Sequence, residues 1–272
     1  MNRESMLIEA EDLLAKIDDP NIRVYDATIL FFRQESEPTA YDQYLQGHIP
    51  GAAFFDHQHF SDPNSDYMYM VLPETDLATQ IGNIGIAEDT EVIFYTNGLL
   101  PSATRAWWIL RYAGHNNVRV LNGGLAAWQK AGGDIEQAPR QYKAAVFEGH
   151  PQPDMFASKE EVEAAMQDSG ICTVNTLPLE SYREAHITGS SCLPCVDLMH
   201  EMASFLPTDQ IANRLKEEAQ HTRIIAYCGG GIAATVNAMA HLMAGNTNVA
   251  VYDGSMNEWI GEGLPITKDG KA

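Results

Sequence analysis

The sequence predicts an α/β protein with two similar domains, each a mostly parallel central sheet with helices on both faces. Two observations lead to this prediction. Short apolar runs alternate with stretches of helical periodicity along the chain, which is typical of parallel sheets built from strand–helix–strand units. Several segments also occur twice in the same order, which indicates a duplicated domain.

Three pairs of segments define the repeat, and their nearly constant spacing argues against chance similarity. We therefore expect a first domain at residues 1–138, a second at 155–272 and a linker at 139–154. The linker contains three prolines and little periodicity, as domain connectors do. The pairs are YLQGHIPG (44–51) with YREAHITG (182–189), EVIFYTNG (91–98) with RIIAYCGG (223–230), and VRVLNGGLAAW (118–128) with VAVYDGSMNEW (249–259).

Each half is expected to repeat one order of strands and helices, because short runs rich in Val, Ile and Tyr alternate with helical stretches. Ser158 and Glu161 have the spacing of a capping box at a helix start. Gly245 can close a helix that begins near Ile232. The expected strands are 21–28, 91–96, 118–124, 171–176, 223–228 and 248–254, and the expected helices are 9–17, 101–114, 158–166 and 232–245.

The composition excludes several classes of function. The formal net charge is −20, and such an acidic chain repels phosphate backbones and anionic lipids, so we expect neither nucleic-acid nor membrane binding. There is no apolar run of about eighteen residues, and the N-terminus lacks the apolar block of a signal peptide. Four cysteines in a chain of this length do not form a disulfide framework. We expect a soluble cytoplasmic protein with free thiols.

One cysteine has the surroundings of a reactive thiol. Cys228 ends a predicted strand and is followed by three glycines and a predicted helix. Glycines let the backbone approach an atom closely, and successive N–H groups at a helix N-terminus can converge on an anion. This arrangement favours an exposed thiolate at the carboxyl end of a strand, where ligands bind in parallel sheets. The same cradle would fit a persulfide.

Two other interpretations compete with a reactive thiol. Cys228 could be a core residue before a tight turn. However, Thr96 occupies its position in the first half, as expected for a duplicated scaffold with one working site. A phosphatase loop would need an arginine at position 234 to grip the phosphate, and the chain has Ala234 there. Phosphoryl transfer is therefore disfavoured.

Taken together, the motifs resemble those of a tandem-domain rhodanese, a family that includes thiosulfate and 3-mercaptopyruvate sulfurtransferases. The resemblance covers nearly the whole chain, and the combination of motifs is specific although no single motif is. It implies two rhodanese-like domains, of which the first, with Thr96, is inactive and the second is catalytic. The motifs are VYDAT (24–28), GHIPGAAFFD (47–56), TRAWWILRYAGH (104–115), LNGGLAAW (121–128), YCGGGIAA (227–234) and VYDGSMNEW (251–259).

The resemblance also implies a reaction. Cys228 would attack the sulfane sulfur of a small-molecule donor, become a persulfide, and pass the sulfur to a thiol or to cyanide. Backbone N–H groups of the loop after the cysteine would hold the sulfur. No metal or organic cofactor is implied. The loop consists of Gly229, Gly230, Gly231, Ile232 and Ala233.

The resemblance favours 3-mercaptopyruvate over thiosulfate as donor. In the family, Cys-Arg-Lys-Gly accompanies thiosulfate and Cys-Gly-Ser-Gly accompanies mercaptopyruvate, whereas this chain has three glycines after its cysteine. Residues 175–177 read Asn-Thr-Leu where the family usually has Asp-x-Arg. Arg183 is the nearby candidate for the donor carboxylate, and Arg33 and Arg105 could reach a cleft between the domains. A thiosulfate sulfurtransferase and a non-catalytic persulfide carrier stay open as alternatives.

The other candidate residues are interpreted as structural. His48 and His186 lie in a repeated H-I-x-G segment, and both halves keep it although only one carries the thiol. We therefore expect turn-stabilising histidines rather than a proton relay. Cys192 and Cys195 form a CxxC that could be a redox pair or metal ligands, but strand-like surroundings and the missing second pair favour a structural role. Cys172 lies in an apolar strand. Trp107, Trp108, Trp128 and Trp259 are expected in the core.

Overall fold

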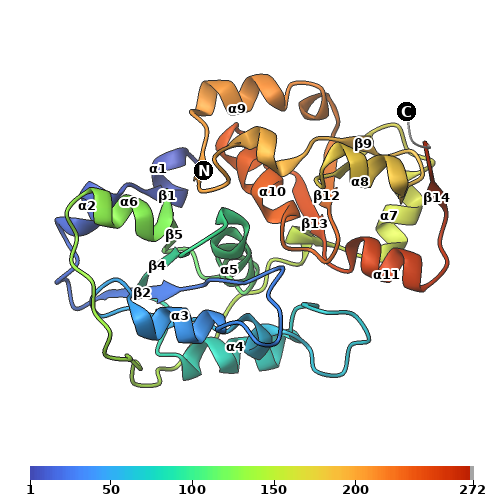
Figure 1. Cartoon of the computed structure of the whole chain (residues 1–272). Helices are drawn as coiled ribbons and strands as arrows, with labels where there is room; N and C mark the ends of the chain where they lie inside the picture. The colour runs from blue at the N-terminus through green and yellow to red at the C-terminus, as the bar shows by residue number, and fades with distance from the viewer. Residues whose placement is uncertain (270–272) are drawn as a thin grey trace.

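The computed structural model describes residues 1–269, which form two lobes that are each built on a five-stranded sheet (Figure 1). The first lobe is blue to green in Figure 1. Its strands are β1 (Leu7–Ile8), β2 (Ile22–Asp26), β3 (Ala53–Phe54), β4 (Glu91–Tyr95) and β5 (Val118–Leu121). Its helices are α1 (Arg3–Met6), α2 (Ala10–Leu14), α3 (Ala40–Gln46), α4 (Glu74–Asn83), α5 (Leu100–Tyr112) and α6 (Gly124–Lys130), with a 3₁₀ turn η1 (His57–Phe60).

The second lobe, yellow to red in Figure 1, repeats this arrangement. Its sheet strands are β6 (Phe156–Ala157), β7 (Ile171–Asn175), β9 (Ser191–Cys192), β12 (Arg223–Tyr227) and β13 (Val249–Tyr252). Two small antiparallel pairs join β10 (Met199–His200) to β11 (Ser204–Phe205) and β8 (His186–Ile187) to β14 (Ile266–Thr267). The helices are α7 (Lys159–Ala165), α8 (Leu179–Glu184), α9 (Thr208–Arg214), α10 (Ala234–Met243) and α11 (Ser255–Gly261), with η2 (Pro153–Met155), η3 (Cys195–Leu198) and η4 (Glu218–Gln220).

The two sheets have equivalent strand orders. The first runs β1-β5-β4-β2-β3 and the second β6-β13-β12-β7-β9, and every pairing within them is parallel. The predicted fold class is therefore confirmed: the chain carries two copies of one α/β unit.

Helices cover both faces of each sheet, as predicted. In the central strand β4, Val92 and Phe94 belong to a core that includes α4 and α5, whereas Ile93 and Tyr95 belong to a core with α2 and α6. Strand β12 divides its side chains in the same way, between the shared core and a smaller core with α7 and α11. This alternation follows from the two-residue period of a strand that is buried on both faces.

The lobes meet through the paired helices α5 and α10, which lie together at the centre of Figure 1. A single hydrophobic core runs through both lobes at this contact. The hydroxyls of Thr104 and Thr235 share a hydrogen bond of 2.7 Å across it. The four tryptophans are at most 1 % exposed, which confirms their predicted place in the core.

Several local predictions can be compared with the structure. Gly245 follows α10 with φ +92° and so closes the helix as expected. The capping box at α7 forms only in part: the Ser158 hydroxyl accepts from the Glu161 N–H at 3.2 Å, without the reciprocal bond. The segment 139–154, which we expected to be a linker, contacts the first lobe, where Arg140 forms an isolated β-bridge with Ala53 of β3. None of the helices in the described part of the chain has the length and apolar character needed to cross a membrane.

Candidate active site

Cys228 directly follows β12, at the carboxyl end of the second sheet and between the ends of β7 and β13. Cys228 is only 2 % exposed. The expectation that its thiolate would be exposed is therefore wrong. A segment of the first domain lies beside the cysteine loop, because the carbonyl oxygen of Met68 is 3.7 Å from where a Cβ on Gly230 would be. No local pattern in the sequence records this contact, since the two residues are far apart in the chain.

Three carbonyls of the cysteine loop are held away from the thiol by neighbouring segments. The Cys228 carbonyl accepts from Met256 N–H at 3.0 Å, and the Gly229 carbonyl accepts from Asn257 N–H at 2.9 Å. The Gly231 carbonyl accepts from Nη1 of Arg105 at 3.3 Å. Because the C=O and the following N–H of a peptide point in opposite directions, these contacts turn the next three amides toward the other side of the loop.

Ser255, at the start of α11, anchors the cysteine loop by hydrogen bonds. Its Oγ accepts from the N–H groups of Cys228 at 3.1 Å and Gly231 at 3.0 Å, and donates to the Tyr252 carbonyl at 2.7 Å. Ser255 itself has φ +50°. Sequence reasoning missed this residue. The repeat did contain a signal for it, because a serine stands where the first half has Gly124. In the structure both residues have a left-handed backbone, with φ +58° at Gly124.

The remaining loop amides are free. Within residues 1–269, the N–H groups of Gly229, Gly230, Ile232 and Ala233 meet no hydrogen-bond acceptor. Four unpaired donors in the loop between Cys228 and α10 form a site that can bind an anion. The Gly231 N–H, which the sequence analysis also expected to hold the sulfur, is already bonded to Ser255.

The glycines of the loop differ in what they require. Gly231 has φ +72°, and a Cβ there would lie 2.6 Å from the Asp253 carbonyl oxygen. A Cβ on Gly230 would lie 3.0 Å from Nδ2 of Asn257, whereas a Cβ on Gly229 would meet nothing within 4 Å. Only Gly231 is therefore demanded by both the backbone conformation and the packing.

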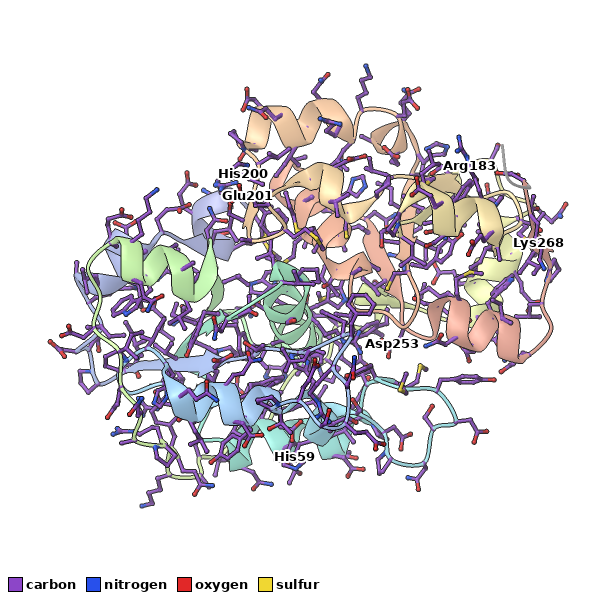
Figure 2. All side chains as sticks on the ribbon, viewed as in Figure 1. His59, Arg183, His200, Glu201, Asp253 and Lys268 are labelled. Atoms are coloured by element: carbon purple, nitrogen blue, oxygen red, sulfur yellow. The ribbon has the colours of Figure 1, made fainter. Side chains whose placement is uncertain are left out.

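A buried ion pair joins the first domain to the cysteine loop. Nη1 of Arg105 lies 2.6 Å from Oδ1 of Asp253, and Nη2 donates to the Tyr69 carbonyl at 2.6 Å. Oδ2 of Asp253 accepts from the Val71 N–H at 2.7 Å. Figure 2 shows Asp253 at the junction of the two lobes. Arg105 thus reaches the interdomain contact, as the sequence suggested, but its charge is already paired there.

A cavity of about 300 Å³ opens on the first-domain side of this junction. Tyr69 borders it, as do Arg33, Asp56 and His57. Nε2 of His57 donates to the Ala27 carbonyl at 3.0 Å, and burial together with the charge of Arg105 lowers the pKa of His57 to about 3. His57 is therefore neutral at physiological pH, and the charged side chains that border the cavity are Asp56 and the exposed Arg33.

Arg183 lies elsewhere. It is on α8, and in Figure 2 it points toward the edge of the second lobe near Lys268, apart from Asp253. Among the described residues, no hydrogen bond or ion pair joins its side chain to the cysteine loop. Its positive charge slightly opposes the rise in the pKa of Cys192.

The other thiols are not activated. All four cysteines are free. Burial raises the pKa of Cys192 to about 11 and that of Cys195 to about 12, and it also raises the pKa of Cys172. These thiols keep their protons at neutral pH, which supports the structural interpretation of the CxxC. In the described part of the chain, no group of three or more His, Cys, Asp or Glu side chains is arranged to hold a metal ion.

The repeated histidines stabilise turns. Nδ1 of His48 bonds the Tyr44 carbonyl at 2.7 Å, and Nδ1 of His186 bonds the Tyr182 carbonyl at 2.8 Å. Each imidazole also stacks on the same tyrosine, with ring centroids 3.9 Å and 3.8 Å apart. The identical contacts in both halves confirm the structural interpretation.

Comparison with known proteins places these features in a family. The sequence profile of the rhodanese-like domain matches residues 9–131 and 158–262. The chain is 30 % identical to a thiosulfate sulfurtransferase of Cricetulus griseus, over 97 % of this chain and 95 % of the relative. It is 32 % identical to a 3-mercaptopyruvate sulfurtransferase of Escherichia coli K12, over 93 % and 94 % of the two chains.

A solved structure gives the same result. The crystal structure of an Escherichia coli protein described as a 3-mercaptopyruvate sulfotransferase superposes with a TM-score of 0.85 at 30 % identity, covering 92 % of this chain and 98 % of that one. A yeast protein, Tum1, has the same fold with a TM-score of 0.84 at 20 % identity. Profile, sequence and fold agree over nearly the full length, and the chain therefore belongs to the rhodanese family of sulfurtransferases.

Proposed function

We propose that this sulfurtransferase takes sulfur from 3-mercaptopyruvate in preference to thiosulfate, and that it carries the sulfur as a persulfide on Cys228. The observation that carries the proposal is the set of four free N–H groups around the loop, on Gly229, Gly230, Ile232 and Ala233. These donors would stabilise a negative sulfur in both the thiolate and the persulfide state.

The reaction proceeds by double displacement. The Cys228 thiolate attacks the sulfur of 3-mercaptopyruvate, an S–S bond forms, and the C–S bond breaks. The electron pair of that bond goes to carbon as an enolate, which takes a proton to become pyruvate. An acceptor thiol or cyanide then attacks the outer sulfur, the S–S bond breaks, and the Cys228 thiolate returns.

The preference for 3-mercaptopyruvate rests on charge. Thiosulfate is a dianion, and the loop offers it no basic side chain, because Gly229 and Gly230 follow the cysteine. The backbone amides supply only partial charge, and the Arg105 charge is paired with Asp253. A donor with one carboxylate and an uncharged thiol makes the smaller electrostatic demand on this site.

The carboxylate of the donor has two candidate partners. The cavity of about 300 Å³ favours Arg33, which borders it near Tyr69, whereas the family resemblance favours Arg183. If Arg33 binds the carboxylate, Arg33→Gln should raise KM for 3-mercaptopyruvate about tenfold, since a charged hydrogen bond is lost. Arg183→Gln is the matched variant, and a larger effect there would shift the assignment to Arg183.

The decisive experiment compares both donors with one variant. The wild type should release pyruvate from 3-mercaptopyruvate at a kcat/KM at least about tenfold above its release of sulfite from thiosulfate. With donor alone, mass spectrometry should find one added sulfur atom on the Cys228 peptide. Cys228→Ser should lose both while keeping the wild-type melting temperature. Transfer that persists in Cys228→Ser would end the proposal.

A persulfide carrier is the second candidate. It is favoured by the absence, within the described residues, of a free arginine bonded to the loop. Such a carrier would acquire the added sulfur on Cys228 but would turn over slowly with both donors. Higher turnover with thiosulfate would instead identify a thiosulfate sulfurtransferase.

A further inference from the structure

Each domain extends a hairpin that contacts the other domain, and the two hairpins are equivalent in the repeat. The first hairpin, Ser61–Leu72, closes through a bridge between Ser61 and Val71, and it reaches from the first lobe toward α11, as the cyan loop in Figure 1. The second hairpin, Met199–Leu206, is formed by β10 and β11. Each returns to its own 3₁₀ turn by the same bond: Leu72 N–H to Phe60 at 3.1 Å, and Leu206 N–H to Leu198 at 3.0 Å. The hairpins are thus counterparts in the repeat.

Each hairpin is held by an equivalent side chain of the opposite domain. In the second domain, Oδ2 of Asp253 accepts from the Val71 N–H at 2.7 Å. In the first domain, Oδ1 of Asn122 accepts from the Phe205 N–H at 2.9 Å. Asp253 and Asn122 occupy matching places in VYDGS (251–255) and VLNGG (120–124). Asn122 also donates through Nδ2 to the Glu9 carboxylate at 3.1 Å and 3.2 Å, and Nη1 of Arg3 donates to the Leu206 carbonyl at 2.9 Å.

Within the described residues, a buried ion pair exists at only one of the two contacts, because the Arg3–Glu9 pair at the other contact is partly exposed. Arg105 follows Thr104 on α5, and Val236 follows the matching Thr235 on α10. The positions beside Cys228 therefore hold an arginine and an aspartate, whereas the matching positions of the repeat hold a valine and an asparagine. Since the second hairpin is held without a buried ion pair, holding a hairpin does not by itself require one, and the pair beside the thiol calls for another explanation.

The bonds of Arg105 supply that explanation. The residue is 1 % exposed, and its two terminal nitrogens bind the Gly231 carbonyl, the Asp253 carboxylate and the Tyr69 carbonyl. Holding the Gly231 carbonyl fixes the plane of the peptide to Ile232, so the Ile232 N–H points the opposite way. A cation on the carbonyl also polarises that amide and makes its N–H a stronger donor.

We propose that Arg105 and Asp253 are positioning residues for the sulfur cradle: they orient the Ile232 N–H toward the sulfur of Cys228 and fix the first hairpin over the loop. This inference rests on the proposed function, because it assigns a task within the same site. Neither residue touches the reacting atoms. The first domain thus contributes to the chemistry of the second, although it lacks a cysteine at Thr96.

The test removes both charges of the buried pair beside Cys228. The double variant Arg105→Val/Asp253→Asn places the residue types of Val236 and Asn122 at the matching positions, and it avoids the buried unpaired charge that a single change would leave. The readout is the pH midpoint of the thiolate absorbance of Cys228, taken as the difference from the same protein with Cys228→Ser. We expect the midpoint to rise by about one pH unit, and kcat with 3-mercaptopyruvate to fall about tenfold.

Two further variants separate positioning from stability. Thr104→Val weakens the same interface without touching the loop, and it should lower the melting temperature while leaving the thiolate midpoint unchanged. Arg105→Lys keeps the charge but loses the forked geometry, and it should give an intermediate midpoint even if the double variant does not fold. A wild-type midpoint in Arg105→Lys and in any folded double variant would overturn the inference.

The outcome is independent of the proposed donor. If the wild type transferred no sulfur, the proposed function would fail, yet the thiolate midpoint would still report whether Arg105 orients the cradle. If Cys228→Ser abolished transfer while the Arg105 variants kept the wild-type midpoint, the function would stand and the positioning role would fail.

Discussion

At the scale of single residues, the Ser255 hydroxyl fixes the backbone of the cysteine loop from outside the loop. One hydroxyl takes two backbone N–H groups and gives its own proton to the Tyr252 carbonyl. In the first domain the matching residue is Gly124, which leaves the loop after Thr96 without this anchor. Ser255, like Cys228, therefore distinguishes the second copy of the domain from the first.

Ser255→Ala should loosen the cysteine loop. The change leaves the N–H groups of Cys228 and Gly231 buried without an acceptor, at a cost of about 1–3 kcal/mol for each. We expect the free energy of unfolding to fall by about 2 kcal/mol or more, together with sulfur transfer. Urea denaturation and pyruvate release measure the two effects. Ser191→Ala, on an exposed strand, is the control, and equal stability of the two variants would contradict the assignment.

At the scale of elements, the cysteine loop combines one constrained glycine with others that are freer. Gly231 has a left-handed backbone and faces the Asp253 carbonyl, whereas Gly229 faces open space. The sequence shows three identical residues in a row, so it cannot say which of them the fold requires. That distinction depends on β13 and α11, which come later in the chain and close around the loop.

Gly231→Ala and Gly229→Ala should therefore differ. At Gly231 the methyl group meets backbone at 2.6 Å, and the left-handed conformation adds about 1–2 kcal/mol for a residue with a Cβ. We expect a loss of about 2–4 kcal/mol of stability, including the overpacking, and near-complete loss of transfer. The free energy of unfolding of Gly229→Ala should lie within about 1 kcal/mol of the wild-type value. Comparable denaturation midpoints for the two variants would refute this account of the loop.

At the scale of the whole molecule, one core passes through both lobes, and it contains buried histidines that stay neutral. His241 on α10 is fully buried, and its Nδ1 accepts from Nδ2 of Asn246 at 3.1 Å. Burial lowers the pKa of His241 to about 4 and that of His57 to about 3. In the unfolded chain both have ordinary values near 6.5.

The sign of the pH effect follows from these pKa values. Below about pH 6.5 the unfolded chain binds protons at these positions and the folded chain does not. The free energy of unfolding therefore decreases as the pH is lowered from about 6.5 to the pKa of the folded state. Each histidine should account for about 2 kcal/mol of the loss between pH 8 and pH 5. His241→Gln should flatten the curve of unfolding free energy against pH by that amount. A variant with the wild-type slope would show that His241 is protonated in the folded state.

The sequence by itself determined the fold class and the duplication, and it singled out Cys228 as the proposed nucleophile. These depend on local properties: the periods of buried strands and helices, and a cysteine followed by three glycines at the end of a strand. Thr96 at the matching position in the first half was also visible at this level. The structural role of the repeated histidines followed from their presence in both copies.

Only the tertiary structure decided what surrounds the thiol. Arg105 and Asp253 are 148 positions apart in sequence, and Val71 and Asp253 are 182 apart. No local pattern records that these residues meet. The anchor at Ser255 arises because β13 and α11 close around the loop within the second domain, whereas the contacts of Arg105 and of the two hairpins arise because the domains dock through α5 and α10. The physical reason is that hydrogen-bond partners are set by proximity in space, and the partners of Gly231 lie 24 and 126 positions away in the sequence.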